Sequence, residues 1–297
     1  MFCKLHDWVD KLLYHCRELE LERISACFWH TSCGTMAASV ALIQGASRGL
    51  GLAFCKHILN KSPAVVIATC RDPDAAAGLQ ELSAKHRDRL TLLRLDVTSE
   101  EDIRGSAELV KSRFGRLDLL VNASAQLHPS GKGETSLRDV SAQGILATLT
   151  TNTVGPLVMA KYFAPLLQKG GGGFGQQPGE KAKQHSGVIA NITAKVGSIG
   201  DNGLGGWYSY RLSKAALNMA TKNLSIELGR ARPKVLCVSL HPGTLNTDLS
   251  RPYHKNVPKD KLFTTEHSVN CLMHIIDTLD INRTGKAFNW DGTELPW

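Results

Sequence analysis

The sequence predicts a single α/β domain built on a doubly wound parallel sheet of about seven strands, with helices on both faces. Two observations support this fold class. From residue 39 onward, short apolar stretches of strand length alternate with longer stretches of helix length, as in strands joined by helical crossovers. Gly is frequent, with 27 residues, and only 6% of the chain is aromatic. This composition suits a sheet covered by helices better than a β-sandwich.

The elements follow in order along the chain. The apolar stretches that we expect to form strands are 39–44, 64–70, 90–95, 118–122, 187–193 and 234–240, with a short seventh strand near Lys286–Phe288. Helices are expected near 50–60, 74–87, 99–114, 143–168, 207–230 and 265–279. Right-handed crossovers would distribute these helices over both faces of the sheet. Residues 169–186 are rich in Gly and charge, so we expect a flexible surface insertion before the fifth strand.

The segment before this pattern is expected to be an appendage. Apolar residues recur at helical spacing over residues 5–24, which indicates an amphipathic helix within an N-terminal extension of residues 1–35. The domain itself would span 36–297 and begin at Met36. A structural or membrane-surface role for 1–35 is an alternative, although its mixed charge argues against a membrane surface. We expect no membrane span, because no apolar run reaches about 20 residues. We also expect no signal peptide, because the start of the chain has acidic residues and lacks a continuous apolar region.

Charge and cysteine content exclude several classes of protein. The formal net charge is +8, but the basic residues are scattered without interleaved aromatics, so we expect no nucleic-acid partner. Of the eight Cys residues, Cys55, Cys237 and Cys271 stand alone in apolar stretches. This usage is typical of reduced thiols in a cytoplasmic protein. The Cys and His residues near the N-terminus lack zinc spacing, so no metal site is expected.

Three glycines indicate a dinucleotide site. Gly45, Gly49 and Gly51 lie between the first strand and the next helix, with the spacing G-x-x-x-G-x-G. Glycines let the backbone turn tightly and approach a pyrophosphate, and the helix then offers its N-terminal N–H groups to the anion. The rest of the turn is expected to contact the cofactor as well, namely Ser47, Arg48 and Leu50.

The end of the second strand predicts which nucleotide binds. An acidic side chain there would bind the ribose hydroxyls of NAD, but this strand is followed by Arg71. Arg71 and Arg48 suit a 2′-phosphate, so we expect NADP(H). The alternative is that Arg71 is a solvated loop residue and that Asp72 or Asp74 binds the ribose.

The third strand supplies a further candidate at its end. Asp96 is expected to bind the adenine amino group, and Val97 beside it to line the same site. Alternatively, Asp96 caps the helix that begins near Ser99.

A Tyr and a Lys carry the candidate chemistry. Tyr210 and Lys214 are four residues apart, so they share one face of the predicted helix. An ammonium beside a phenol favours the phenolate and lowers the Tyr pKa from about 10. We therefore expect Tyr210 to act as an acid or base near neutral pH.

Taken together, these motifs resemble the short-chain dehydrogenase/reductase superfamily, which has a Rossmann-like fold. The matching residues are Gly45-x-x-x-Gly49-x-Gly51, Asp96, Asn122, Asn152-Thr-Val-Gly155, Tyr210-x-x-x-Lys214 and Pro242-Gly243, in the order and spacing of that family. The resemblance covers 37–297. Within it, the segments 122–131, 196–207 and 291–297 look like the C-factor/sniffer-like carbonyl reductases.

The resemblance implies a role for each matching residue. Tyr210 would exchange a proton with the substrate oxygen, and Lys214 would bind the nicotinamide ribose and tune Tyr210. Asn152 would hold a water of the proton relay, unless its amide is satisfied locally. Thr247 would contact the nicotinamide carboxamide, unless it caps the next helix. The cofactor cleft would also include Asn122, Pro242 and Gly243.

The chain departs from the family pattern at two places. The usual Asn-Asn-Ala-Gly after the fourth strand is replaced by 122–125, Asn-Ala-Ser-Ala, and the position of the catalytic Ser holds Ala194. Thr193 and Ser198 are the hydroxyls that could replace it. Strand alternation turns Thr193 toward the opposite face unless the strand twists or bulges there.

The preferred hypothesis is an NADP(H)-dependent enzyme that reduces a carbonyl substrate, an aldehyde or ketone, to an alcohol. Because of Ala194, the alternative is an NADP-binding regulatory or signalling protein with weak catalysis. A sugar-nucleotide epimerase fits less well, since little chain follows Pro242. We expect a lid at 248–263, and a homodimer or tetramer through the helices 143–168 and 207–230. The expected substrate contacts are His128, Trp207, Tyr208 and Tyr253.

Overall fold

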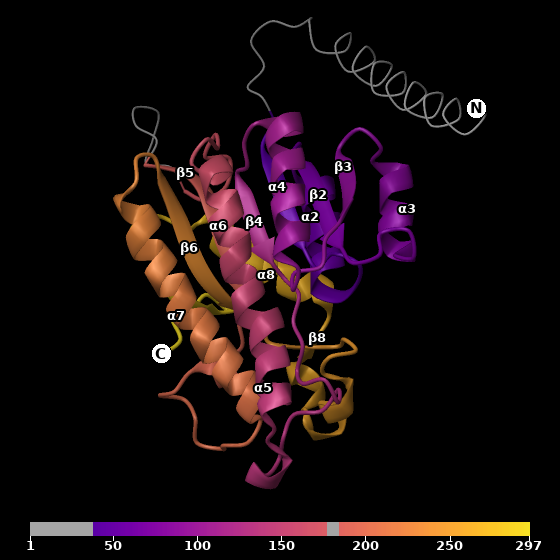
Figure 1. The fold of residues 1–297 in the computed structure, drawn as a ribbon, viewed down its shortest axis with the longest axis vertical. Coiled ribbons are helices and arrows are strands. Elements are labelled where there is room, and N and C mark those ends of the chain that lie inside the picture. Colours follow the sequence, from indigo (N-terminus) through magenta and orange to yellow (C-terminus); the bar gives the residue numbers. More distant parts are fainter. Residues whose placement is uncertain (1–37, 177–183) are drawn as a thin grey trace, which may run out of the picture. The chain divides into compact units, whose positions relative to one another are not determined.

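Seven parallel strands form the central sheet of the computed structural model, in the order β3-β2-β1-β4-β5-β6-β9 (Figure 1). The structure describes residues 38–176 and 184–297. The strands are β1 (Val40–Gln44), β2 (Val65–Cys70), β3 (Leu90–Arg94), β4 (Leu119–Asn122), β5 (His185–Ile192), β6 (Lys234–His241) and β9 (Ala287–Asn289). Neighbouring strands are parallel throughout. Successive strands are added on one side of β1 up to β3, and from β4 onward they are added on its other side. The predicted fold class is confirmed.

The helix predicted at 5–24, the extension 1–35 and the start at Met36 lie outside the described residues.

Helices cover both faces of the sheet. On one face pack α2 (Gly49–Lys61), α3 (Ala77–Lys85) and α8 (Thr265–Asp277), and on the other α4 (Glu100–Phe114), α6 (Gly155–Leu167) and α7 (Tyr208–Arg230) (Figure 1). Each face has its own apolar core. Phe54 and Leu79 are fully buried in the first core, and Phe163 is fully buried in the second. The strands separate the two cores, which explains why most of their residues are apolar on both faces.

The helix predicted at 143–168 is interrupted in the structure. It consists of α5 (Ala142–Leu149) and α6, joined by one π-helical turn at Thr150–Val154. This π-helical turn directs the buried Asn152 side chain toward the backbone of Gln126. Such turns commonly accompany functional sites, and helical periodicity does not predict them.

The Gly-rich insertion differs from its prediction where the structure describes it. The backbone N–H of Gly171 donates to Asp118 Oδ1 at 2.5 Å, and that of Gln176 donates to the Leu279 carbonyl at 2.8 Å. Phe174 is buried in the core. The segment up to residue 176 therefore packs on the domain, and β5 begins inside the range predicted as flexible. Its glycines serve close backbone approach rather than mobility.

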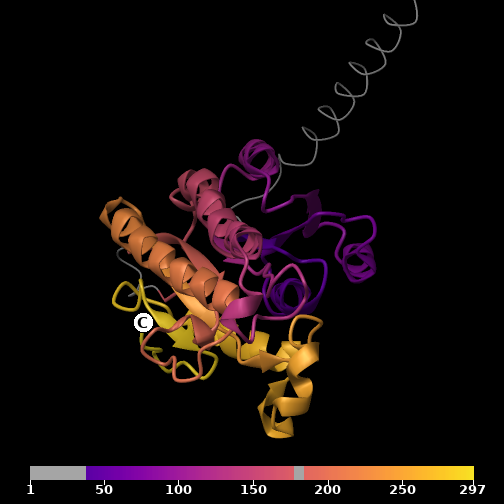
Figure 2. The same cartoon turned by 60° about the horizontal axis from the view of Figure 1, so that its bottom comes forward.

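The predicted lid is anchored at both ends by a small parallel strand pair, β7 (Thr244–Leu245) with β8 (Leu262–Phe263). Between them lie two short 3-10 helices, Arg251–Asn256 and Lys259–Lys261. This segment projects from the body beyond β8 (Figure 2). Within the described ranges, none of the helices has the length and apolar character to cross a membrane.

Candidate functional site

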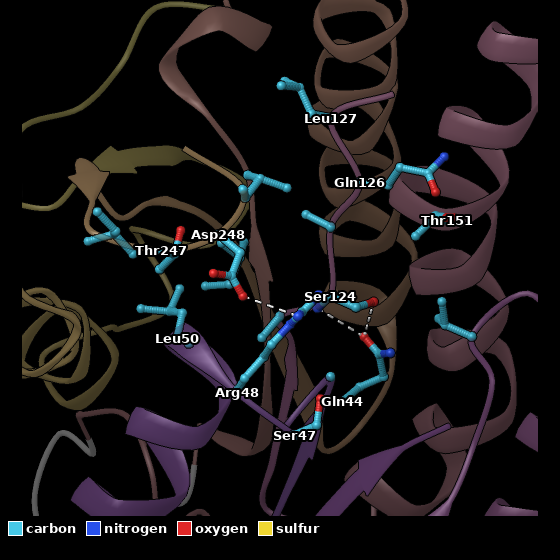
Figure 3. Close-up of a pocket in the computed structure, with 18 of the residues that line it drawn as sticks. Gln44, Ser47, Arg48, Leu50, Ser124, Gln126, Leu127, Thr151, Thr247 and Asp248 are labelled. Atoms are coloured by element: carbon cyan, nitrogen blue, oxygen red, sulfur yellow. Dashed lines mark hydrogen bonds and ion pairs between the residues drawn. The ribbon is translucent and has the colours of Figure 1, made fainter. Parts of the chain in front are cut away.

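A cavity of about 1020 Å³ lies at the carboxyl ends of the strands. Its wall includes Gln44 and Cys70 at the ends of β1 and β2, Ala123 after β4 and Ile192 at the end of β5. The start of α2, the first turns of α7 and the lid complete it (Figure 3). Ligands of doubly wound sheets bind at this edge, where the strand order reverses.

Two glycines of the turn, Gly45 and Gly51, leave no room for a side chain. Gly45 has φ +83°, and a Cβ there would lie 2.6 Å from the backbone nitrogen of Ser124. A Cβ on Gly51 would collide with the carbonyl oxygen of Gly45. Gly49, with φ +56°, begins α2, whose first turn contains no acidic residue. The open backbone and the unopposed helix N-terminus fit the pyrophosphate of a dinucleotide.

The turn is braced by a contact that the sequence analysis missed. The Ser124 hydroxyl donates to Gln44 Oε1 at 2.8 Å, which joins the ends of β1 and β4 beneath the glycines. Ser124 is one of the positions where the chain departs from the family pattern. The only sequence signal was that Gln44 is a polar residue that closes an apolar strand, and its partner lies 80 positions away.

Arg71 lines the cavity, whereas Asp72 and Asp74 do not. Asp72 Oδ1 accepts a hydrogen bond from the backbone N–H of Ala75 at 3.1 Å, so this carboxylate stabilises the turn before α3. Of these three side chains, only the cationic one belongs to the cavity wall.

Asp96 and Val97 line the cavity beside it. Thr98 donates to Asp96 Oδ1 twice, from its backbone N–H at 2.9 Å and from its hydroxyl at 2.7 Å. Partial burial raises the pKa of Asp96, but these hydrogen bonds and neighbouring arginines outweigh burial, so the pKa lies below its ordinary value. Ser99, not Asp96, provides the side-chain cap of α4.

Arg48 reaches from the glycine turn to the lid (Figure 3). Its Nη1 lies 3.1 Å from Asp248 Oδ2, and the other oxygen of Asp248 lies 2.7 Å from Arg251 Nη2. All three side chains are exposed, so these ion pairs add little to stability. Arg48 lines the cavity as predicted, but its guanidinium is paired with a lid residue.

Tyr210 and Lys214 line the same cavity from α7. Lys214 Nζ lies 5.7 Å from the centre of the Tyr210 ring and donates to the Ile192 carbonyl at 2.8 Å. Burial lowers the pKa of Lys214 to about 7. Burial also raises the pKa of Tyr210 above its ordinary value, opposite to the predicted lowering. The predicted effect depends on a fully charged ammonium, and this buried amine loses its proton near neutral pH.

Asn152 is held by hydrogen bonds to both the loop after β4 and α7. Its Oδ1 accepts from the Gln126 N–H at 2.8 Å, while its Nδ2 donates to the Gln126 carbonyl at 2.7 Å and to Ser213 Oγ at 3.0 Å. Ser213 Oγ donates in turn to the Tyr210 carbonyl at 2.8 Å. The Asn152 amide is therefore satisfied by local hydrogen bonds.

Both candidate hydroxyls for the missing Ser have other partners. Thr193 lines the cavity, but its hydroxyl donates to Asn218 Oδ1 at 2.7 Å. Ser198 lies outside the lining and donates to the Trp297 carbonyl at 3.3 Å. Ala194 packs in an apolar cluster with Tyr210. No donor from these three positions is directed at the Tyr210 end of the cavity without rearrangement.

Some of the remaining cofactor candidates line the cavity, and others lie outside its lining. Gly243 has φ +77°, and a Cβ there would lie 2.7 Å from the Phe263 ring. Asn122 is buried and donates to Asn191 Oδ1 at 2.8 Å. Ser250 rather than Thr247 precedes the first helix of the lid. The predicted residues that line the cavity are Gly45, Ser47, Arg48, Gly49, Leu50, Arg71, Asp96, Val97, Thr193, Tyr210, Lys214, Pro242 and Thr247. Those outside the lining are Gly51, Asn122, Asn152, Ser198 and Gly243.

An aromatic group stands behind the Tyr210 end. The ring centre of Trp207 lies 6.2 Å from that of Tyr210 and 4.6 Å from that of Tyr253 in the lid. Of the four predicted substrate contacts, His128 lines the cavity, while Trp207 and Tyr253 pack around Tyr210. Tyr208 does neither, because side chains two positions apart on a helix point in different directions.

Comparisons with known proteins identify the family of this chain. The family model for short chain dehydrogenases matches residues 39–258. The NADPH-bound carbonyl reductase from chicken fatty liver is 32% identical, with a TM-score of 0.76 over 89% of this chain and 100% of that chain. Carbonyl reductase Sniffer of D. melanogaster is 31% identical, with a TM-score of 0.74 over 88% and 100%. C-signal of Myxococcus xanthus is 34% identical over 184 residues, which are 62% of this chain and 94% of that protein.

These findings confirm the resemblance stated from the sequence, including its likeness to sniffer-type reductases and to C-signal. The family match includes the glycine turn, Tyr210 and Lys214, which the fold brings to one cavity. The chain therefore belongs to the short chain dehydrogenase family, whose members are NAD(P)-dependent oxidoreductases.

Proposed function

We propose that the protein reduces an aldehyde or ketone to an alcohol with NADPH. The observation that carries this proposal is the shared cavity, in which Tyr210 and Lys214 face the same space as the glycine turn of α2. The similarity to the NADPH-bound chicken carbonyl reductase and to Sniffer supports the carbonyl substrate class.

Each residue contributes to positioning or proton transfer. Bound NADPH supplies a hydride. Tyr210, whose pKa is raised by burial, keeps its proton near neutral pH and donates it to the substrate oxygen as negative charge develops there. Lys214 stands beside the phenol and, when protonated, stabilises the phenolate that remains. Asn152 fixes the loop after β4 relative to α7, which keeps the cavity wall in register with Tyr210.

The proposal is tested by following NADPH consumption with a panel of aliphatic and aromatic aldehydes and ketones. We expect turnover of at least one carbonyl class and formation of the matching alcohol. Oxidation of NADPH without alcohol formation, or no turnover by protein that binds NADPH, would contradict the proposal.

We propose NADP(H) rather than NAD(H) because Arg71 lines the cavity, whereas Asp72 and Asp74, which follow it in the sequence, do not. Arg71→Ala is expected to weaken NADPH binding about 10-fold, since it removes a charge-assisted contact to the 2′-phosphate. NADH binding should change less than about twofold. Arg87→Ala, at an exposed position outside the cavity, is the matched control. Equal loss of both cofactors in a fluorescence titration would argue against this role of Arg71.

A regulatory or signalling protein with weak catalysis is the second candidate. The specific observation in its favour is that Ala194 stands at the Ser position while Thr193 and Ser198 bond elsewhere. C-signal of Myxococcus xanthus is among the similar proteins. NADPH binding without turnover on any carbonyl would favour this candidate over the enzyme.

We also propose that two copies associate through α7 and the continuous stretch formed by α5, the π-helical turn and α6. Large apolar side chains are exposed along these helices, namely Leu146, Val154, Leu157, Leu212, Met219 and Ile226. Two-fold pairing would bury such a face against itself. Met219→Glu is expected to shift the protein from dimer or tetramer to monomer in light scattering, because it places a charge in the contact. Leu109→Glu, at an exposed position of α4, is the control and should leave the mass unchanged. An unchanged mass of the Met219→Glu variant would contradict the proposed contact.

A further inference from the structure

Glu134 is a buried carboxylate that the proposed mechanism does not use. It lies on the loop between β4 and α5 and is 3% exposed. Its Oε1 and Oε2 accept from the backbone N–H of Ser209 at 3.1 and 3.3 Å, and Oε1 also accepts from the Ser209 hydroxyl. No ion pair joins it to any described residue. A carboxylate without a cation is costly to bury unless hydrogen bonds stabilise its charge.

That stabilisation comes from the start of α7. The residue before the helix, Trp207, has φ +49° and offers no side-chain cap. It is the one non-Gly residue with positive φ in the described ranges. Glu134 provides the missing acceptor from 75 positions away, and its charge is favourable at a helix N-terminus. Its carbonyl also accepts from the Trp207 N–H at 2.6 Å, so one residue holds the turn from two sides.

The residue after Ser209 is Tyr210. The rest of the helix around Tyr210 is fixed elsewhere, because Ser213 bonds to Asn152 and Lys214 bonds to the Ile192 carbonyl. The first turn of α7 has no other side-chain partner of this kind among the contacts of the described chain. The orientation of the phenol therefore depends on Glu134 at the N-terminal end and on Asn152 behind it.

The neighbouring Gly133 links the same point to the lid. Its backbone N–H donates to the Tyr253 hydroxyl at 2.7 Å. A Cβ on Gly133 would lie 2.7 Å from the Trp207 ring, so only glycine lets the loop pass this close. The Trp207 ring stacks in turn against Tyr253. The loop, the lid and the start of α7 thus meet at Gly133 and Glu134.

We propose that Glu134 is a positioning residue for Tyr210. It sets the start and direction of the helix that carries the phenol, and it keeps the substrate-side loop docked against that helix. This inference rests on the proposed reductase function. It predicts that loss of the carboxylate affects turnover more than cofactor binding, because the glycine turn lies on α2 and shares no hydrogen bond with this junction.

The test compares Glu134→Ala, Glu134→Gln and Ser209→Ala. Glu134→Ala is expected to lower kcat about 100-fold, the size of effect that a displacement of about 1 Å can have, with the Kd for NADPH within about twofold. Glu134→Gln retains an amide oxygen that accepts from the Ser209 N–H, so it should recover most of kcat. Ser209→Ala removes only the hydroxyl and should fall between them. Glu101→Ala, an acid in the first turn of α4, is the control and should match the unmodified protein.

Hydrogen exchange gives a readout that does not need turnover. In Glu134→Ala the amides of Ser209 to Leu212 should exchange at least about tenfold faster, while the amides near Leu217 stay protected. If the unmodified protein binds NADPH but reduces no carbonyl, the proposed function fails and exchange alone decides the role of Glu134. Unchanged kcat or unchanged exchange in Glu134→Ala would overturn the inference. So would an equal loss in Glu134→Ala and Glu134→Gln. If Glu134→Ala does not fold, kcat and hydrogen exchange are compared between Ser209→Ala and Glu134→Gln instead.

Discussion

Tyr210→Phe is expected to lower carbonyl reduction about 1000-fold, because it removes the proton that neutralises the developing alkoxide. Positioned acids of this kind contribute about 100- to 10,000-fold to rates. The phenyl ring should still fill the buried space beside Ala194 and Leu127. The hydroxyl has no hydrogen-bond partner among the described residues, so the change should cost little stability.

Initial rates of NADPH oxidation and the NADPH Kd measure this effect. Binding should stay within about threefold, since the ring remains and the glycine turn is untouched. Tyr208→Phe is the matched control, because Tyr208 lies on the same helix but does not line the cavity. Because burial raises the pKa of Tyr210, the rate of the unmodified protein should not decline from loss of this proton until the pH is alkaline. Equal rates in the unmodified protein and Tyr210→Phe would reject Tyr210 as the acid.

Ala194→Ser is expected to raise kcat about 10- to 100-fold. One donor aimed at the developing oxyanion is worth about 100- to 1000-fold when removed from a working site, and part of that gain should return. Ala194 is 9% exposed and packs against Tyr210, so a hydroxyl there would stand next to the phenol. Thr193 does not supply this donor in its present rotamer, because its hydroxyl bonds to Asn218.

Two companion variants interpret the result. Ala194→Val adds bulk without a hydroxyl and should not raise kcat. Thr193→Val should leave kcat nearly unchanged if Thr193 has no part in the reaction. The opposite pattern, with no gain from Ala194→Ser and a large loss from Thr193→Val, would assign the polarising role to Thr193 after a change of partner.

The sequence was sufficient for the features that depend on local patterns. The apolar strands, the glycine turn and the spacing of Tyr210 and Lys214 each occupy one short stretch of chain, so periodicity and backbone sterics predict them. The position of Arg71 in the cavity wall followed from its place after β2. The structure agrees with these elements because in each of them the local preference and the tertiary fold favour the same conformation.

The features that sequence did not predict depend on contacts between distant segments. The π-helical turn contains Asn152, whose partner Gln126 lies 26 positions away. The brace beneath the glycines needs Ser124 and Gln44, which are 80 positions apart, and the cap on α7 comes from Glu134. The expected effect on the Tyr210 pKa was wrong in direction because helical spacing reports proximity but not burial.

The two ends of the cavity have different anchors, and this allows different rates of evolutionary change. Lys214 is held by the end of β5 and Asn152 by the chain after β4, so both are supported by the sheet. The lid packs near Tyr210 through Leu249 and Tyr253, and the Tyr253 hydroxyl bonds to a backbone N–H rather than to a particular side chain. Substitutions along the lid can therefore accumulate without moving the reacting groups. Descendants of such a chain can acquire new substrates while retaining one chemistry.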